Sequence, residues 1–305
     1  MQNVLIAGGS GLIGRRLTQI LLEEGFSVSI LGRNKTEVLG SHISIYNWDP
    51  ATKFLPEDAL NRADYIINLA GASISKRWSK TYKELIINSR IEATSTLVEV
   101  LNTKPHKVKA LINGSASGFY GFNRVEELSE NSEPGIGFLS ETCEQWEQEA
   151  QKLHCPSTRL IILRTGIVLA KDGGAFPSMA LPIRYWVGSK LGNGKQIIPW
   201  IHMDDLCKMM VFLLMKPEPK GIYNAVAPVS ISNKEMTRAI AKAYHKPLLM
   251  PPVPGFMLRL FLGEFYKALI GSLKISATKI KQEGFLFQYP EIDDALEVLV
   301  PKKKS

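Results

Sequence analysis

The sequence predicts an α/β protein built on a doubly wound parallel sheet, with a smaller C-terminal lobe. Short, continuously apolar runs alternate with amphipathic segments, which is typical of a parallel sheet covered by helices on both faces. A glycine-rich stretch directly follows the first of these runs, and right-handed crossovers between successive strands would give the Rossmann arrangement. The 305 residues, 45% hydrophobic and 22% charged, suffice for a large core without disulfides or a structural metal.

The first half of the chain is expected to supply most of the sheet. Residues 3–7 form a short apolar strand, and residues 12–24 carry apolar side chains at helical spacing until Gly25. Further strands are expected at residues 27–31, 43–46, 64–69, 110–113 and 160–164. Long helices are expected at residues 81–101 and 141–153, the second with Ser140 as its N-cap.

The second half is richer in glycine and proline. Helices are expected at residues 206–215 and 233–244, and the proline-rich residues 246–254 read as a linker. We therefore predict a Rossmann domain over residues 1–170, to which later strands and helices return up to about residue 245. Residues 171–305 would form a mixed substrate-side lobe, including a small C-terminal domain at about residues 250–300.

Charge and cysteine content exclude several classes of protein. The net charge is +8, but no aromatic RNA-binding signature, zinc-finger spacing or basic helix is present, so we expect a solvated basic surface and no nucleic-acid partner. Cys143, Cys155 and Cys207 form no CxxC pair and are expected to be reduced thiols of a cytoplasmic protein. The first residues carry no positive charge, and the apolar residues 256–275 are interrupted by charges. We expect neither a signal peptide nor a membrane partner.

The glycine-rich stretch has the spacing of a dinucleotide-binding loop. Its glycines permit a tight turn, a close approach of the backbone to a pyrophosphate, and close packing of helix on strand. The helix that follows would present its N–H groups and partial positive charge to the phosphates. Because the loop stands between an expected strand and an expected helix, a structural turn alone is the weaker interpretation. The residues expected to hold the pyrophosphate are Gly8, Ser10, Gly11, Leu12, Ile13 and Gly14.

The end of the second expected strand discriminates between NAD and NADP. An NAD site would place Asp or Glu there to bind the ribose hydroxyls. This chain has Arg33 instead, followed closely by Lys35. A guanidinium can bind a 2′-phosphate through two hydrogen bonds, so Arg33 predicts NADP (NADPH) as the cofactor. The alternative is a solvated basic loop.

Several motifs resemble those of the extended short-chain dehydrogenase/reductase superfamily. They cover residues 8–14, 68–71, 115–121 and 201–206. More closely, the chain resembles an atypical group of that superfamily described as epimerase family proteins. The features shared with this group are Lys76-Arg77-Trp78, Ser89-Arg90, Trp146-Glu147, residues 163–169, Gly173-Gly174, residues 199–202 and a C-terminal extra domain over residues 251–300.

The resemblance implies NADP binding and assigns further residues to it. Leu69, Ala70 and Gly71 would line the path of the adenosine and ribose. Arg90 lies where the superfamily often has an asparagine that faces the cofactor. It could contact a cofactor phosphate or a substrate carboxylate, or it could be an ordinary arginine on a helix surface.

The superfamily's catalytic tyrosine and lysine are absent. There the tyrosine exchanges a proton with the substrate, and a lysine four residues later lowers its pKa. None of the nine tyrosines here has a lysine at that offset. The tyrosine position falls on Leu139 and the lysine position on Cys143, which could be a reactive thiol or a buried apolar residue.

Three hydroxyl groups are candidates to replace that pair, namely Ser115, Ser117 and Tyr120. They follow the fifth expected strand, where parallel sheets bind their ligands. The serines could equally satisfy backbone groups of the turn, and Tyr120 could be packed within its loop. His202, Asp204 and Asp205 could suggest a metal, but Asp204 or Asp205 is more simply the cap of the helix expected at residue 206, and we expect no metal.

Together these features predict an NADP-dependent oxidoreductase or epimerase-like enzyme that acts on a small molecule. The missing tyrosine–lysine pair favours an alternative, a catalytically silent NADP-binding regulator or scaffold, whereas the retained residues 115–121 and 199–206 favour an enzyme. Nucleic-acid binding through the basic surface is a third interpretation. Among relatives, a homodimer through the two long helices is common, so a homodimer is an open expectation here.

Overall fold

The computed structural model describes residues 1–32, 43–122, 124 and 126–301. The chain divides into two compact units. Unit 1 comprises Met1–Phe119, Phe138–Arg164 and Cys207–Tyr223, and unit 2 comprises Tyr120–Gly137, Thr165–Leu206 and Asn224–Ser305. Each unit is thus assembled from three separate stretches of chain, and the division into domains at residue 170 stays a prediction.

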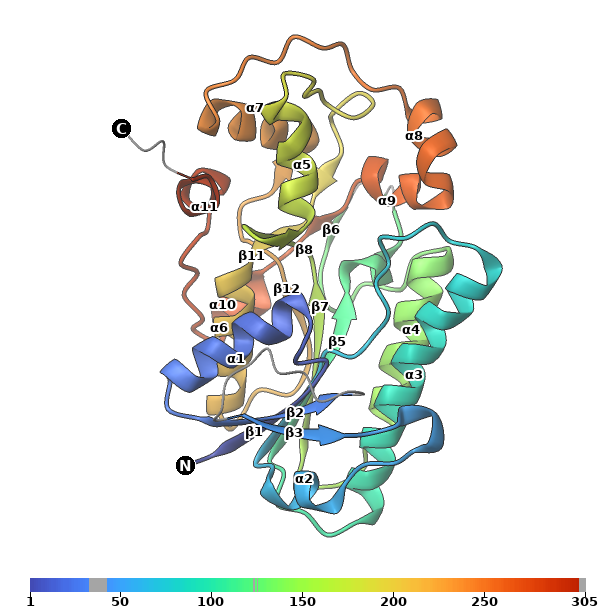
Figure 1. Cartoon of the computed structure of the whole chain (residues 1–305), viewed down its shortest axis with the longest axis vertical. Helices are drawn as coiled ribbons and strands as arrows, with labels where there is room; N and C mark the ends of the chain where they lie inside the picture. Colours follow the sequence, from blue (N-terminus) through green and yellow to red (C-terminus); the bar gives the residue numbers. More distant parts are fainter. Residues whose placement is uncertain (33–42, 123, 125, 302–305) are drawn as a thin grey trace. The chain divides into compact units, whose positions relative to one another are not determined.

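Unit 1 is built on a parallel sheet, as the sequence predicts (Figure 1). The sheet has seven strands, of which the last, β12, was not expected from the sequence. The strand order is β12-β7-β5-β4-β1-β2-β3. The bounds are Asn3–Ala7 for β1, Ser27–Gly32 for β2, Ser44–Asn47 for β3, Tyr65–Asn68 for β4, Ala110–Ala116 for β5, Arg159–Thr165 for β7 and Gly221–Ala225 for β12. Because β1 pairs with both β2 and β4, the strand order reverses beside β1. The loops that follow β1 and β4 therefore flank the switch point at which doubly wound sheets bind ligands.

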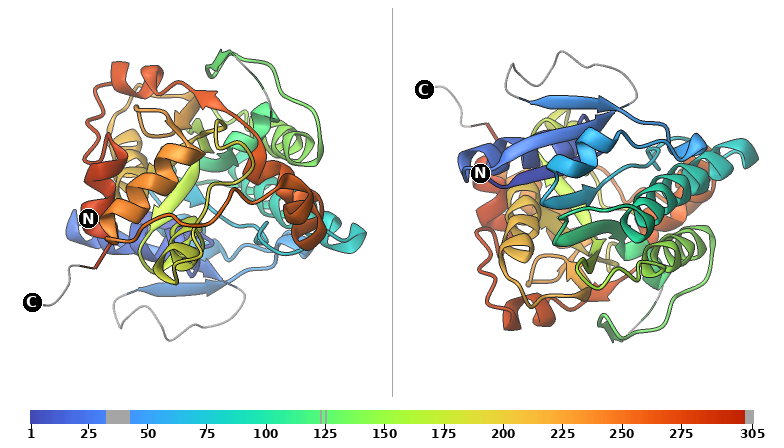
Figure 2. Two further views of the ribbon diagram at one scale, coloured as in Figure 1. Left: turned by 90° about the horizontal axis from the view of Figure 1, so that it is seen from above. Right: turned by 90° about the horizontal axis from the view of Figure 1, so that it is seen from below.

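Helices cover both faces of this sheet (Figures 1 and 2). One face carries α1 (Leu12–Glu23) and α6 (Met203–Met215), and the other carries α3 (Lys80–Thr103) and α4 (Phe138–Gln151). The short helix α2 (Glu57–Arg62) packs on the same side as α3. The core under α3 is a continuous apolar cluster that includes Leu5, Leu31, Leu60, Leu97 and Leu111.

Unit 2 contains smaller sheets and short helices. The strands are β6 (Glu127–Leu128), β8 (Ile167–Ala170), β9 (Gly173–Gly174), β10 (Ile197–Ile198), β11 (Trp200–His202), β13 (Ile231–Ser232) and β14 (Lys274–Ile275). The helices are α5 (Ala175–Arg184), α7 (Asn233–Ala243), α8 (Gly255–Leu262), α9 (Tyr266–Ile270), α10 (Thr278–Gln282) and α11 (Ile292–Leu299). Its core is an apolar cluster that contains Trp200 and side chains of α5, α7 and α11.

Two predicted helix starts are wrong. The helix expected to begin after Ser140 begins at Phe138, and the Ser140 hydroxyl donates to the carbonyl oxygen of Phe119 at 2.6 Å instead of capping. The helix expected at residue 206 begins at Met203, so Asp205 lies within its first turn. Its carboxylate accepts the backbone N–H groups of Gln288 and Tyr289 at 2.8 and 2.9 Å.

Within the described part of the chain, no helix has the length and apolar character needed to cross a bilayer.

Candidate functional site

The loop between β1 and α1 has no room for side chains at two of its glycines. Gly8 has a φ of +81°, and a Cβ there would lie 2.7 Å from the carbonyl oxygen of Leu69. A Cβ on Gly14 would lie 2.5 Å from the carbonyl oxygen of Gly8 and 2.6 Å from the Cα of Gly9. All of these neighbours are backbone atoms, so the loop keeps this close shape only with glycine at positions 8 and 14.

The N-terminus of α1 faces the same loop and is uncapped. Gly11 is its N-cap and offers no side-chain acceptor, and the first turn has no acidic residue. The backbone N–H groups of Leu12 and Ile13 are among the first in the helix, which have no partner within it. Ser10 and Gly11 are exposed beside them. This arrangement fits the pyrophosphate of a dinucleotide, which helix N-termini bind through such donors.

The loop after β4 is held in place by a buried polar network. The Asn68 side chain donates to Thr94 Oγ1 at 3.0 Å and to Asn113 Oδ1 at 2.8 Å, and all three residues are fully buried. Asn68 Oδ1 in turn accepts the backbone N–H of Ala70 at 3.2 Å. This network fixes the start of the predicted Leu69-Ala70-Gly71 segment next to the glycine loop.

Arg90, on α3, lies under Gly71. A Cβ on Gly71 would meet the Arg90 Cζ at 3.1 Å, so the backbone passes directly over the guanidinium. Nη1 of Arg90 donates to the carbonyl oxygens of Ala72 and Ile86, at 3.1 and 2.9 Å. The Arg90 guanidinium also stacks over the Trp146 ring, 5.2 Å from its centroid. Arg90 is thus partly buried and held beside the loop that follows β4, and its role in binding a ligand stays a prediction.

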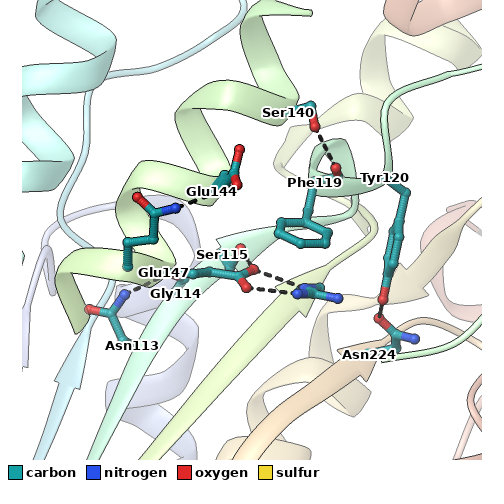
Figure 3. Close-up of polar contacts among 11 residues, drawn as sticks. Asn113, Gly114, Ser115, Phe119, Tyr120, Ser140, Glu144, Glu147 and Asn224 are labelled. Carbon is teal, nitrogen blue, oxygen red and sulfur yellow. Dashed lines mark hydrogen bonds and ion pairs between the residues drawn. The ribbon is translucent and has the colours of Figure 1, made fainter. Parts of the chain in front are cut away.

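Ser115 takes part in a buried ion-pair network (Figure 3). Its hydroxyl donates to Glu147 Oε1 at 2.6 Å. Arg164 donates to both oxygens of the same carboxylate, from Nε at 2.9 Å and from Nη2 at 2.8 Å. The side chains of Glu147 and Arg164 are each 3% exposed, and Arg164 stacks on Phe119 with its Cζ 3.4 Å from the ring centroid. The hydroxyl of Ser115 is therefore committed to Glu147.

The hydroxyls of the two other candidates, Tyr120 and Ser117, differ in their hydrogen bonding. Tyr120 is fully buried and donates to Asn224 Oδ1 at 2.6 Å, a contact that favours the packed-loop interpretation (Figure 3). Ser117 is 9% exposed, and its hydroxyl forms no hydrogen bond with the described residues. Of the three candidates, Ser117 is the one whose hydroxyl the described structure leaves available to a ligand. The catalytic roles of all three stay predictions.

The face of α4 on which the superfamily places its tyrosine and lysine is apolar here. Gly118 packs against this face, since a Cβ there would lie 3.2 Å from Leu139 Cβ and 3.8 Å from Cys143 Sγ. Burial raises the pKa of the Cys143 thiol to about 11. Cys143 is therefore protonated at neutral pH, which favours its role as a small apolar residue over that of a nucleophile.

Two predictions bear on other ligands. Arg33 lies outside the described residues, so its role in binding a 2′-phosphate stays a prediction. Among the residues that the structure describes, no group of three or more His, Cys, Asp or Glu side chains could hold a metal ion. His202 packs its ring against Tyr289, with centroids 4.0 Å apart, and its Nδ1 accepts the backbone N–H of Asp204.

Sequence reasoning missed the Glu147–Arg164 pair and the Asn68–Thr94–Asn113 network. Glu147 was available as part of the Trp146-Glu147 motif, and Arg164 directly follows the apolar residues 160–163 near the end of β7. A charge at the end of a buried strand indicates a buried partner, because an unpaired charge is costly there. That signal predicts a partner for Arg164, but only the fold identifies it as Glu147.

The doubly wound sheet and the glycine loop at its switch point define a protein of the NAD(P)-binding short-chain dehydrogenase/reductase type. The chain belongs to the NAD dependent epimerase/dehydratase family, whose model matches residues 4–225. Residues 253–299 match a separate domain of unknown function, DUF1731.

The similarity to other proteins extends over nearly the whole chain. An epimerase family protein of Staphylococcus saprophyticus is 36% identical, over 98% of this chain and 100% of that protein. The crystal structure of human epimerase family protein SDR39U1 (isoform 2) with NADPH is 30% identical, with a TM-score of 0.89, over 98% of this chain and 99% of that one. A nucleoside-diphosphate sugar epimerase from Corynebacterium glutamicum is 29% identical with a TM-score of 0.78, and the match covers 97% of this chain and 57% of that one.

Proposed function

We propose that this protein is an NADP-dependent oxidoreductase or epimerase-like enzyme of the atypical short-chain dehydrogenase/reductase type, acting on a small molecule. The observation that carries the proposal is the β1–α1 loop, where Gly8 and Gly14 leave no space for a Cβ and the helix N-terminus is uncapped. NADP is favoured over NAD by Arg33 in the sequence and by the relative whose crystal structure contains NADPH.

The residues proposed to bind the cofactor are those of the two loops at the switch point. Gly8, Ser10, Gly11, Leu12, Ile13 and Gly14 would bind the pyrophosphate, while Leu69, Ala70 and Gly71 would follow the adenosine and ribose. NADPH, when bound, supplies a hydride. Ser117 would offer its hydroxyl to a substrate oxygen, and Ser115 would anchor the end of β5 through Glu147.

The alternative proposal is a catalytically silent NADP-binding regulator or scaffold. Leu139 and the protonated Cys143 favour it, because neither can exchange a proton with a substrate near neutral pH. For partners, we propose a small molecule, neither nucleic acid nor membrane, and a homodimer. We propose the cytoplasm as the location.

Substrate turnover or NADPH oxidation, measured across a panel of metabolites, distinguishes the enzyme from the regulator. Conversion of the substrate is measured as well because an epimerase returns its hydride and consumes no NADPH. The enzyme proposal expects turnover with at least one compound, and a fall of about 10²–10⁴-fold in turnover for Ser117→Ala if its hydroxyl takes part in proton transfer. NADPH binding should be unchanged in that variant. Tight binding of NADPH with no turnover across a broad panel would instead support the regulator.

A further inference from the structure

Arg90 is a partly buried cation that forms no ion pair with a carboxylate among the described residues. A guanidinium carries donors on three nitrogens in one plane. Both of its hydrogen bonds leave Nη1, whereas Nε and Nη2 bond to nothing in the described part of the chain. One edge of the guanidinium is therefore left free to bind.

Partial burial of the guanidinium favours an anion as the partner of its free edge, although the atoms of that edge are not themselves fully buried. Desolvation lowers the pKa of Arg90, and Cys143 and Tyr82, the groups that oppose this effect, are not carboxylates. A buried charge is costly unless it is paired and hydrogen-bonded. Two carbonyl oxygens satisfy part of that need, and an anionic oxygen pair on the free edge would complete it.

The guanidinium is also held rigidly where ligands bind. Gly71 lies on one side of it and the Trp146 ring contacts it from α4, so the plane of the fork cannot turn freely. Gly71 follows β4, whose carboxyl end borders the switch point of the sheet. A fixed planar fork at this edge suits bidentate recognition of a carboxylate or phosphate.

The chain around Arg90 is basic as well. Residues 69–83 include Lys76, Arg77, Lys80 and Lys83 and no acidic residue. Lys76 and Arg77 are exposed on the loop that Arg90 anchors through Ala72. The positive electrostatic potential of these side chains would therefore attract an anion towards the Arg90 guanidinium.

We propose that the Nε and Nη2 edge of Arg90 binds a carboxylate or phosphate group of the substrate, and that the substrate of this protein is consequently an acid. This inference rests on the proposed function, because it takes the switch-point edge to be a substrate site. It assigns to Arg90 the recognition of the substrate and not of the dinucleotide.

The test is calorimetric titration of the NADPH-saturated protein with inorganic phosphate and with acetate, at constant ionic strength. NADPH bound at the glycine loop would block the phosphate site proposed there, so that the titration reports on the site proposed at Arg90. Arg90→Gln should weaken phosphate and acetate binding about tenfold or more and leave the NADPH affinity within about twofold. Arg90→Lys, which keeps the charge but not the fork, should fall between wild type and Arg90→Gln.

Arg159→Gln is the matched control. Arg159 also donates to two backbone carbonyl oxygens, those of Pro219 and Leu214, but it opens β7 and so lies at the amino end of a strand. Its replacement should leave anion binding unchanged.

Two results would overturn the inference. The first is phosphate and acetate binding by Arg90→Gln equal to that of wild type. The second is a loss of NADPH affinity in Arg90→Gln with anion binding of the NADPH-saturated protein unaffected, which would assign Arg90 to the cofactor. Failure of wild type to bind NADPH would count against the proposed function alone, since the anion titrations of wild type and Arg90→Gln can still be compared without NADPH.

Discussion

Glu147→Ala is expected to lower the free energy of unfolding by about 3–5 kcal/mol, because it leaves the Arg164 guanidinium buried without its carboxylate. The carboxylate currently accepts both Arg164 hydrogen bonds and the one from Ser115. These three hydrogen bonds to the carboxylate would be lost in a region where Ser115, Glu147 and Arg164 are at most 5% exposed. Urea denaturation of the variant and wild type measures the change.

Two further variants separate this effect from a general weakening of α4. Glu144→Gln, whose carboxylate meets only the Gln148 amide at 3.4 Å among the described residues, should change the stability by less than about 0.5 kcal/mol. The double variant Glu147→Leu with Arg164→Met removes both charges and should recover much of the lost stability. If Glu147→Ala were as stable as Glu144→Gln, the buried ion pair would contribute little to the stability of the fold.

Gly14→Ala is expected to weaken NADPH binding by at least about tenfold and to lower the free energy of unfolding by about 1–3 kcal/mol. Its Cβ would lie 2.5 Å from the Gly8 carbonyl oxygen and 2.7 Å from that of Gly9. Because these are backbone atoms, relief requires α1 to move away from the loop, which displaces the N–H groups proposed to bind the pyrophosphate. Fluorescence titration with NADPH and thermal unfolding measure the two effects.

Gly255→Ala is the matched control, because Gly255 also lies in the first turn of a helix but has open surroundings. A Cβ there would come no closer than 4.0 Å, to Ile270 Cδ1. This variant should leave both NADPH affinity and stability within about 0.5 kcal/mol of wild type. NADPH affinity of Gly14→Ala equal to that of Gly255→Ala would contradict the placement of the cofactor on the loop.

The parallel sheet was predictable because its strands are short apolar runs separated by helical patterns. Residues 3–7 were predicted as a strand and form β1 with the same bounds. Helix α2 was missed because its six residues are too few to show a helical period. The start of α4 was misplaced because Ser140 looks like a cap in sequence, whereas tertiary structure gives its hydroxyl the Phe119 carbonyl as an acceptor.

The candidate site was predictable to a lesser extent. The glycine loop could be predicted from its spacing. Gly14 is required by backbone contacts within the loop, whereas Gly8 is required by its positive φ and by the carbonyl oxygen of the distant Leu69. The hydrogen bond from Ser115 to Glu147 joins residues that are 32 positions apart, and the one from Tyr120 to Asn224 joins residues that are 104 apart. Neither hydrogen bond could therefore be predicted from a local sequence pattern. The missing tyrosine–lysine pair was visible in the sequence, but the apolar packing of Leu139 and Cys143 against Gly118 needed the fold.

This chain is proposed to bind NADP(H) through the β1–α1 loop and Arg33. Titration of wild type and Arg33→Ala with NADPH, NADP and NADH, followed by nicotinamide fluorescence or heat, tests this proposal most directly. Loss of a charged contact to the 2′-phosphate should weaken NADPH binding by roughly 10- to 150-fold while NADH, which lacks that phosphate, is little affected. Failure of every dinucleotide to bind wild type at micromolar concentrations would contradict the claim and leave the glycine loop a purely architectural feature.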